Sequence, residues 1–241
     1  MLKRLSLYTF LLCLVPIFVW IFSWAWAGDN HLTQFDHFLY WLTETGSVPY
    51  AVISCAVFAL LFYPIFPNRK KWMLGVGVMV LSMVATQGIK TVAKNAFAEP
   101  RPYVVQFEEQ SGMSSEAFYA LPRNEREVVI HHFYAAKTDV PTWLAHHREN
   151  ETGYSFPSGH AIFAAAWLLL AVGFTEFYGR CRTASKLLVA GTLIWAVLML
   201  VSRLRLGMHY PIDLFASILI AWIVHGVIFT FLAKKAIFIK E

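Results

Sequence analysis

Charged residues are scarce in this chain: aspartate, glutamate, lysine and arginine make up only 15% of its 241 residues. Soluble globular domains average roughly 25% charged residues and need that polar surface to face water. Hydrophobic residues account for 58% of the chain and aromatic residues for 16%, and the mean hydropathy is +0.53. This composition excludes a disordered, fibrous or small disulfide-stabilised protein and indicates a membrane domain.

Cysteine is scarce too, and none of the three cysteines has a partner in a long polar loop. Cys13 and Cys55 lie within apolar runs and Cys181 lies between two arginines, so we interpret all three as unpaired thiols.

The formal net charge of +5 would suggest nucleic acid as a partner of a soluble protein. Here the basic residues flank apolar runs, and we expect no nucleic-acid partner.

Six stretches lack Asp, Glu, Lys and Arg, and each is interpreted as a membrane-spanning helix, because about 17 to 25 residues cross a bilayer. The two shortest need polar residues at their ends, namely Pro157 to His160 for one and Lys186 and Arg203 for the other. We therefore predict an all-α, polytopic membrane protein with six transmembrane helices. The six stretches are Ser6 to Ala27, Thr45 to Asn68, Trp72 to Ile89, Ala161 to Thr175, Leu187 to Ser202 and Leu214 to Ala233.

The first stretch allows a second interpretation. Lys3 and Arg4 precede it and Ala25-Trp26-Ala27 ends it, as in a signal peptide with its cleavage site. Its apolar part is longer than that of a typical signal peptide, so we favour an uncleaved first helix.

Basic residues gather at alternate ends of successive helices, which predicts cytoplasmic N- and C-termini. The clusters are Lys3 and Arg4; Arg69 to Lys71; Arg180, Arg182 and Lys186; and Lys234, Lys235 and Lys240. Residues 1–241 then form a single membrane domain in which residues 103–155 are a small external helical cap between helices three and four. Ser114 to Leu121 and Asn124 to Lys137 are expected to form short helices of this cap, with turns near Pro122 and Pro141.

The unusual polar residues cluster at four helix ends that this topology places on the external side. The clusters are Lys94 to Pro102, Pro157 to His160, Ser202-Arg203, and His209 with Asp213. Because ionisable residues are costly in or near a membrane, their convergence indicates a functional site.

Cations and a helix start make this site suitable for a phosphate group. Lys94, Arg101 and Arg203 supply positive charge, and Ser158 and Gly159 lie where a helix N-terminus offers backbone N–H groups. Gly159 would let an oxyanion approach the backbone closely, and Ser158 could add its hydroxyl.

The two histidines of the site are expected to have different roles. Asp213 follows His209 by four residues, a helical spacing that can bring its carboxylate to one imidazole nitrogen and make the other a better nucleophile or base. His160 is then left for proton transfer. A metal site is the alternative for such a cluster, but three cations would repel a divalent ion, so we expect no metal.

Other histidines are interpreted as structural or solvated. The pairs His131-His132 and His146-His147 could bind a metal, but adjacent side chains on a helix diverge, so we interpret them as solvated loop histidines. His225 lies about 18 Å deeper along the last helix than Asp213. It is expected to be a packed, hydrogen-bonded residue outside the site.

Read together, the polar clusters resemble the three-part signature of the type 2 phosphatidic acid phosphatase superfamily of lipid phosphate phosphatases. The first part is Lys94 followed, after six residues, by Arg101-Pro102. The second is Pro157-Ser158-Gly159-His160. The third is Ser202-Arg203, with His209 after five more residues and Asp213 after a further three.

The resemblance implies that His209 attacks phosphorus to form a phosphohistidine, Asp213 orients it, and His160 acts as general acid and base. It further implies that Lys94, Arg101, Ser158, Gly159 and Arg203 bind the phosphoryl oxygens and that no cofactor or metal is needed. The implied partners are the bilayer and lipid phosphates, and the implied location is a Gram-negative inner membrane with the site facing the periplasm. The implied substrates are phosphatidylglycerophosphate, phosphatidate, lysophosphatidate, diacylglycerol pyrophosphate and undecaprenyl diphosphate.

Two other functions are considered beside a phosphatase. A lipid phosphotransferase would pass the phosphate of the same phosphohistidine to another lipid. A non-catalytic anion carrier would explain Lys94 and Arg203, but not the pairing of His209 with Asp213.

Overall fold

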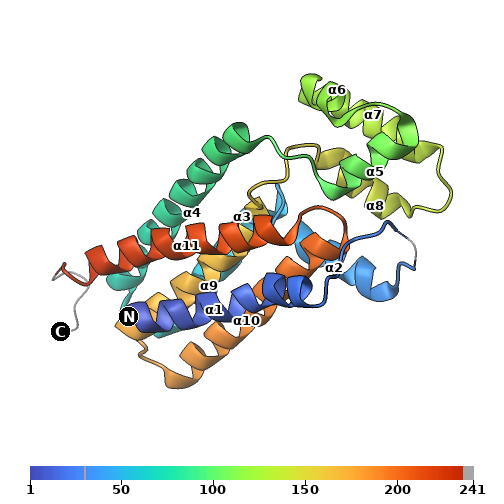
Figure 1. Ribbon diagram of the computed structural model, residues 1–241. Coiled ribbons are helices and arrows are strands. Elements are labelled where there is room, and N and C mark those ends of the chain that lie inside the picture. The colour runs from blue at the N-terminus through green and yellow to red at the C-terminus, as the bar shows by residue number, and fades with distance from the viewer. Residues whose placement is uncertain (30, 236–241) are drawn as a thin grey trace.

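All regular secondary structure is helical in the computed structural model, which describes residues 1–29 and 31–235 (Figure 1). The predicted all-α class is therefore confirmed over this part of the chain, while Lys240, one of the residues used to predict orientation, lies outside it. The helices are α1 (Leu2–Ile21), α2 (Gln34–Glu44), α3 (Tyr50–Leu61), η1 (Tyr63–Ile65), α4 (Arg69–Phe97), α5 (Pro102–Ser111), α6 (Ser115–Ala120), α7 (Arg123–Ala135), α8 (Thr142–Asn150), α9 (Gly159–Phe177), α10 (Arg182–Arg205) and α11 (Pro211–Leu232).

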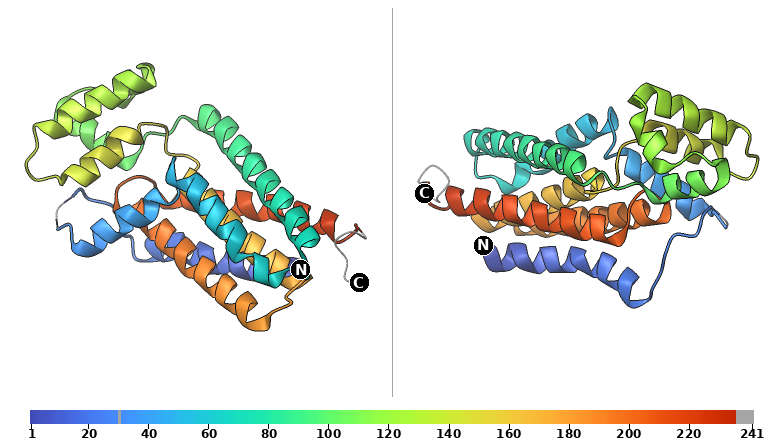
Figure 2. Two further views of the ribbon diagram at one scale, coloured as in Figure 1. Left: turned by 180° about the vertical axis from the view of Figure 1, so that it is seen from behind. Right: turned by 45° about the horizontal axis from the view of Figure 1, so that its top comes forward.

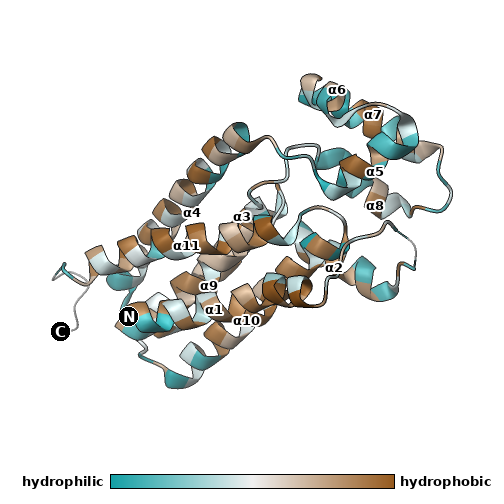
Figure 3. Cartoon of the chain, viewed as in Figure 1, coloured by the Kyte–Doolittle hydropathy of each residue, from teal (hydrophilic) through white to brown (hydrophobic). Residues whose placement is uncertain are grey.

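Five of the described helices are long and apolar enough to cross a membrane: α1, α4, α9, α10 and α11. Brown, hydrophobic residues predominate along them, whereas teal residues are more frequent on α5 to α8 (Figure 3). α9 is the central helix, because 89% of its apolar window is buried, against 28% to 50% for the other four. It packs against α1, α4, α10 and α11, and this arrangement fixes the position of its first turn.

The second predicted span differs from expectation. Its helix, α3, has only 12 residues before the chain turns through η1, which contains Pro64. Twelve residues rise about 18 Å, whereas the hydrocarbon core of a bilayer is about 30 Å thick. Pro49 lies at the N-cap of α3, so prolines bound this helix at both ends. The count of six spans thus stays a prediction.

A helix that the hydropathy pattern did not predict precedes α3. α2 begins at a capping box, in which the Asp36 carboxylate accepts a hydrogen bond from the Thr33 backbone N–H at 2.7 Å. It is amphipathic and packs against α8 and α10, and its last residue, Glu44, reaches the site. An apolar-run search misses such a helix because one of its faces is polar.

The short helices α5 to α8 lie together at one end of the bundle, opposite the N-terminus (Figures 1 and 2). Two of them, α6 and α7, match the helices predicted around Pro122, while α5 and α8 were not anticipated. They share a small core of their own that includes Tyr103, Phe107 and Phe118. Leu206 and Met208 from the loop between α10 and α11 join this core, so the cap is packed onto the loop that leads to His209.

The first helix is an integral part of the bundle. α1 packs against α9, α10 and α11, and its Leu5 and Leu12 are fully buried.

Deep in the bundle, His225 is also fully buried, with Nε2 2.8 Å from Ser82 Oγ and Nδ1 2.7 Å from the Ala221 carbonyl. The predicted packed, hydrogen-bonded state of His225 is confirmed.

Candidate active site

The helix ends that carry the polar clusters meet around one pocket next to α5 to α8. The pocket has a volume of about 800 Å³. Of the predicted site residues, Lys94, Arg101, Gly159, His160 and His209 line it. Three others, Arg203, Asp213 and Ser158, are fully buried behind this lining.

His209 is held between a carboxylate and a guanidinium. Its Nδ1 lies 3.3 Å from Asp213 Oδ2, and its Nε2 lies 3.5 Å from Arg101 Nη1. Because a carboxylate only accepts, Nδ1 carries the proton and Nε2 keeps its lone pair. Burial, and then the positive charges of Arg101 and Arg203, hold the pKa of His209 well below its usual range. The imidazole is therefore neutral, and the lone pair of its Nε2 is on the side of the pocket where Arg101 lies.

Asp213 is fixed by several hydrogen bonds. Its Oδ2 accepts from the Ser155 hydroxyl at 2.5 Å and from the Tyr210 backbone N–H at 2.8 Å. Pro211 begins α11, so Asp213 lies in its first turn, where a negative charge is favourable. Ser155 Oγ also lies 3.3 Å from His209 Nδ1, so this serine supports both members of the pair.

His160 lies in the first turn of α9 and faces a different partner set. Its Nε2 is 3.0 Å from Ser47 Oγ and 3.8 Å from Glu151 Oε1. Gly46 makes room for the ring, since a Cβ at that position would lie only 2.7 Å from His160 Cδ2. Ser47 and Glu151 thus lie on the same side of the ring, next to Nε2.

Arg203 has one half of its guanidinium bonded and the other half without a hydrogen-bond partner. Its Nη1 donates to Thr43 Oγ1 at 2.7 Å and lies 3.1 Å from His147 Nε2. Nε and Nη2 are buried and make no hydrogen bond in the described structure, and Nη2 is 3.7 Å from Glu151 Oε2. Unsatisfied buried donors are costly, so this edge is suited to an oxyanion.

Arg101 and Glu151 form a nearly buried ion pair at the pocket wall. Arg101 Nη2 donates to Glu151 Oε2 at 2.8 Å and Arg101 Nε donates to the Gly153 carbonyl at 2.7 Å. Burial by itself raises the pKa of the Glu151 carboxyl, but Arg101, His160 and Arg203 hold it well below its usual range. Glu151 is therefore a carboxylate that sits among the cations expected to bind phosphate.

The lysine and the glycine predicted to bind phosphate, Lys94 and Gly159, both line the pocket. Lys94 donates to the Tyr154 carbonyl. Lys90, one turn earlier on α4, also lines the pocket. The space beside Gly159 is taken by the Lys90 side chain, because a Cβ on Gly159 would lie 2.8 Å from Lys90 Cδ. Ser158 caps α9 by accepting a hydrogen bond from the Ala161 N–H at 3.3 Å.

One interpretation of the loop histidines was wrong. His131, His132 and His146 are exposed, but His147 is 1% exposed and lies against Arg203. It points inward because α8 packs on α2, a contact between distant segments that residue spacing does not reveal. Within the described ranges, no group of three or more His, Cys, Asp or Glu residues is arranged to hold a metal ion.

Sequence reasoning also missed Lys90, Glu151 and Ser47. A signal was present for two of them: Lys90 precedes Lys94 by four residues and so shares its helix face, and Glu151 closely precedes the Pro157 to His160 cluster. Ser47 carried none, because a serine in a short turn is common and its partner His160 is 113 residues away.

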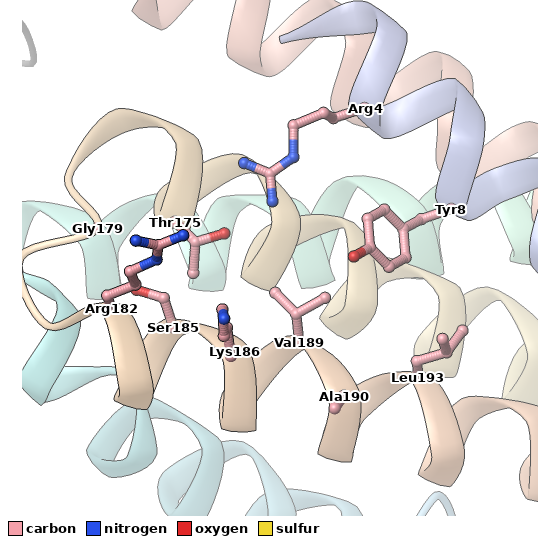
Figure 4. Close-up of a pocket in the computed structure, with 10 residues that line it drawn as sticks. All are labelled: Arg4, Tyr8, Thr175, Gly179, Arg182, Ser185, Lys186, Val189, Ala190 and Leu193. Atoms are coloured by element: carbon pink, nitrogen blue, oxygen red, sulfur yellow. The ribbon is translucent and has the colours of Figure 1, made fainter.

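A second pocket, of about 540 Å³, lies at the opposite end of the bundle (Figure 4). Arg4, Arg182 and Lys186 bring positive charge to it, and Tyr8 and Leu193 line its apolar part. None of its lining residues is a histidine or a carboxylate, so it lacks a nucleophile and a proton donor of the kind found in the first pocket.

Comparison with known proteins agrees with the geometry of the first pocket. The family model of the PAP2 superfamily matches residues 75–237, which include all the predicted site residues. The chain belongs to the PAP2 superfamily. This PAP2 chain is 57% identical over 241 residues to phosphatidylglycerophosphatase B of Haemophilus influenzae, with both chains covered completely. It is 34% identical over 234 residues to phosphatidylglycerophosphatase B of Escherichia coli, covering 97% of this chain and 89% of that one.

A solved structure shares the fold of this PAP2 protein. It is a transmembrane PAP2 type phosphatidylglycerolphosphate phosphatase from Bacillus subtilis, matched with a TM-score of 0.56 at 16% identity over 97% of this chain and 98% of that one. With five long apolar helices in the described residues and membrane-embedded relatives, the chain is a multi-pass membrane protein.

Proposed function

We propose that this protein is a membrane phosphatase that hydrolyses phosphatidylglycerophosphate to phosphatidylglycerol. The observation that carries the proposal is the pairing of His209 with Asp213, which leaves Nε2 of His209 unprotonated in a pocket beside Arg101. The names of the two relatives described above support this choice of substrate, because both are phosphatidylglycerophosphatases B.

The walls of the pocket favour a lipid over a soluble phosphate ester. Its polar floor continues into an apolar wall formed by Val52 on α3, Met83 on α4 and Phe163 on α9. A phosphate head group can bind the floor while its acyl chains stay against apolar side chains and the bilayer. The same shape suits phosphatidate, lysophosphatidate, diacylglycerol pyrophosphate and undecaprenyl diphosphate, which we propose as further substrates.

The first chemical step is phosphoryl transfer to the enzyme. His209 Nε2 attacks phosphorus, the bond from phosphorus to the leaving oxygen breaks, and His160 gives that oxygen its proton. Asp213 accepts the hydrogen bond from Nδ1 and stabilises the charge that develops on the ring. Lys94, Arg101, Arg203 and the backbone N–H groups after Ser158 stabilise the phosphoryl oxygens.

The second step is hydrolysis of the phosphohistidine. Water attacks phosphorus, His160 takes its proton, and inorganic phosphate leaves with His209 regenerated. The cations already supply the charge that a divalent ion would bring, so we propose that no metal or cofactor takes part.

The proposed setting is an inner membrane crossed six times, with residues 103–155 and the site on the periplasmic side. We expect a cysteine at Glu116 on α6 to react with an impermeant maleimide from the periplasmic side and one at Arg69 to be protected. Labelling of both from one side would contradict this topology.

Purified variants provide the test of the chemistry. We expect wild type to release phosphate from phosphatidylglycerophosphate in the presence of EDTA, and His209→Ala to be inactive and to form no phosphoenzyme. His160→Ala should lose about 10² to 10⁴ in rate on the lipid and less on an activated aryl phosphate, whose leaving group needs no proton. Rapid-quench labelling of the first turnover measures both steps, with exposed His146→Ala as the control.

Three results would count against this proposal. Labelled intermediate in His209→Ala but not in His160→Ala would mean that the roles are reversed. Loss of activity in EDTA that a divalent ion restores would refute metal independence. Transfer of the labelled phosphate to a second lipid in place of water would favour a phosphotransferase.

A further inference from the structure

A buried chain of hydrogen bonds leads from α2 through α8 to the cationic floor of the pocket. Glu44, at the end of α2, has Oε1 2.8 Å from Nδ1 of His147 on α8. The other ring nitrogen of His147, Nε2, is 3.1 Å from Arg203 Nη1 on α10. Glu44 is 18% exposed and His147 only 1%, so solvent has little access to this chain.

The protonation of His147 follows from its partners. A guanidinium can only donate, so Nε2 must accept from Arg203 and Nδ1 must carry the proton that is donated to Glu44. His147 is thus neutral and in one tautomer, and only this state satisfies both neighbours. Burial is the main cause of a lowered pKa for His147, assisted by Arg203 and opposed by Glu44.

These bonds determine which edge of Arg203 is available. Nη1 has two protons, and Thr43 Oγ1 and His147 Nε2 accept both. The remaining edge, Nε and Nη2, is the pair of nitrogens that can bind a carboxylate or phosphate through two parallel hydrogen bonds. Both atoms are buried and make no hydrogen bond in the described structure, and the nearest carboxylate oxygen, Glu151 Oε2, is 3.7 Å from Nη2.

We propose that His147 and Glu44 are a positioning pair that holds Arg203 with its Nε–Nη2 edge toward the phosphoryl group. The inference rests on the proposed phosphatase function and adds two residues that act through Arg203. Thr43 and His147 fix the guanidinium in its plane, and Glu44 fixes the tautomer of His147.

A dependence of oxyanion affinity on pH follows from this arrangement. When His147 binds a second proton, Nε2 no longer accepts from Arg203 and two cations face each other, so Arg203 must turn away. The other groups facing the ring are Glu44 and the Tyr40 ring from α2, Glu151 from the loop after α8 and His160 from α9, while neighbouring Arg148 turns to Asp29. The two carboxylates favour the second proton and Arg203 opposes it.

Substitutions of His147 separate positioning from packing. Glutamine offers one acceptor and one donor and never becomes charged, so His147→Gln can bond both neighbours at any pH. Leucine fills the space but bonds neither. We expect His147→Leu to raise the KM for phosphatidate and the inhibition constant for orthovanadate about 10-fold or more, with a smaller change in kcat.

The pH profile is the decisive measurement. Wild type and the exposed control His146→Gln should lose orthovanadate affinity as the pH falls below the ordinary histidine value of 6.5, whereas His147→Gln should keep its affinity over the same range. Glu44→Gln should lose affinity only at lower pH than wild type, because the carboxylate that favours the second proton on His147 is gone. Equal inhibition constants for His147→Leu and wild type, or identical profiles for His147→Gln and wild type, would overturn the proposal.

Calorimetric titration with orthovanadate keeps the proposal apart from the phosphatase assignment. It measures binding without turnover and also applies if wild type hydrolyses no lipid phosphate, a result that would refute the phosphatase alone. Absence of orthovanadate binding by wild type would overturn both. If His147→Leu does not fold, as judged by size-exclusion chromatography in detergent, the comparison of His147→Gln with wild type decides.

Discussion

At the scale of single residues, Glu99 is a carboxyl group whose protonation is tied to the site. It follows α4 and lies close to Asp213, and burial together with that neighbouring carboxylate raises the pKa of Glu99 to about 7. The folded protein therefore binds this proton more tightly than the unfolded chain, whose value is 4.5. The stability contributed by the protonated group is complete below about pH 4.5 and is lost as the pH rises through about 7.

Replacing this carboxyl by an amide tests the pH dependence. Glu99→Gln keeps a neutral side chain at every pH, so its apparent unfolding temperature should fall less than that of wild type between pH 4.5 and 7.5. Thermal unfolding in detergent at several pH values measures the difference, with Glu116→Gln on the exposed surface of α6 as control. Parallel curves for wild type and Glu99→Gln would show that Glu99 does not carry this proton.

At the scale of elements, the turn between α2 and α3 determines how closely His160 can approach. Gly46 has no side chain, and a Cβ there would lie 2.7 Å from His160 Cδ2 and 3.3 Å from Met199 Cε. Gly46→Ala must therefore displace the imidazole or the turn. Since a displacement of about 1 Å at a catalytic group can cost about 10²-fold in rate, we expect a marked loss of kcat.

A glycine with open space around it is the matched control for Gly46. Gly77 on α4 would place its Cβ at least 4 Å from any other side chain, so Gly77→Ala should keep wild-type activity. Initial rates on phosphatidate compare the two variants. Equal rates would mean that the turn yields without moving His160.

At the scale of the whole molecule, Arg148 joins the cap to the bundle. Its two terminal nitrogens bind Asp29 at 2.6 and 2.7 Å, and it also donates to the Tyr134 hydroxyl and the Leu206 carbonyl. The residue is fully buried, so removal of its carboxylate partner leaves a buried charge uncompensated. Asp29→Ala should destabilise the protein by about 3 to 5 kcal/mol and loosen the loop that leads to His209.

An exposed ion pair in the same cap offers the comparison for Asp29. Glu127→Ala removes the partner of Arg123, but these side chains are 35% and 69% exposed, and such pairs contribute at most about 1 kcal/mol. Apparent unfolding temperatures and phosphatase rates should both fall for Asp29→Ala and stay near wild type for Glu127→Ala. A similar small effect of the two substitutions would show that the Arg148 contact does not hold the cap.

Much of the fold could be predicted because length and apolarity are local properties of the chain. Five apolar stretches form long helices, and α10 includes Lys186 and Arg203 as its short apolar core required. The α3 segment forms a shorter helix than the length of its apolar stretch suggested, because prolines bound it and it has only 12 residues. The amphipathic α2 escaped notice because only contact with α8 and α10 shows which of its faces is buried.

The sequence by itself determined the composition of the site: its cations, its two histidines, and the four-residue spacing between His209 and Asp213. Only the tertiary structure decided which other residues join them. Glu44 and His147 are 103 residues apart, and His147 and Arg203 are 56 apart. Their contact depends on how α2, α8 and α10 pack against one another. Helical periodicity relates side chains only within a helix, and helix packing relates those on separate helices.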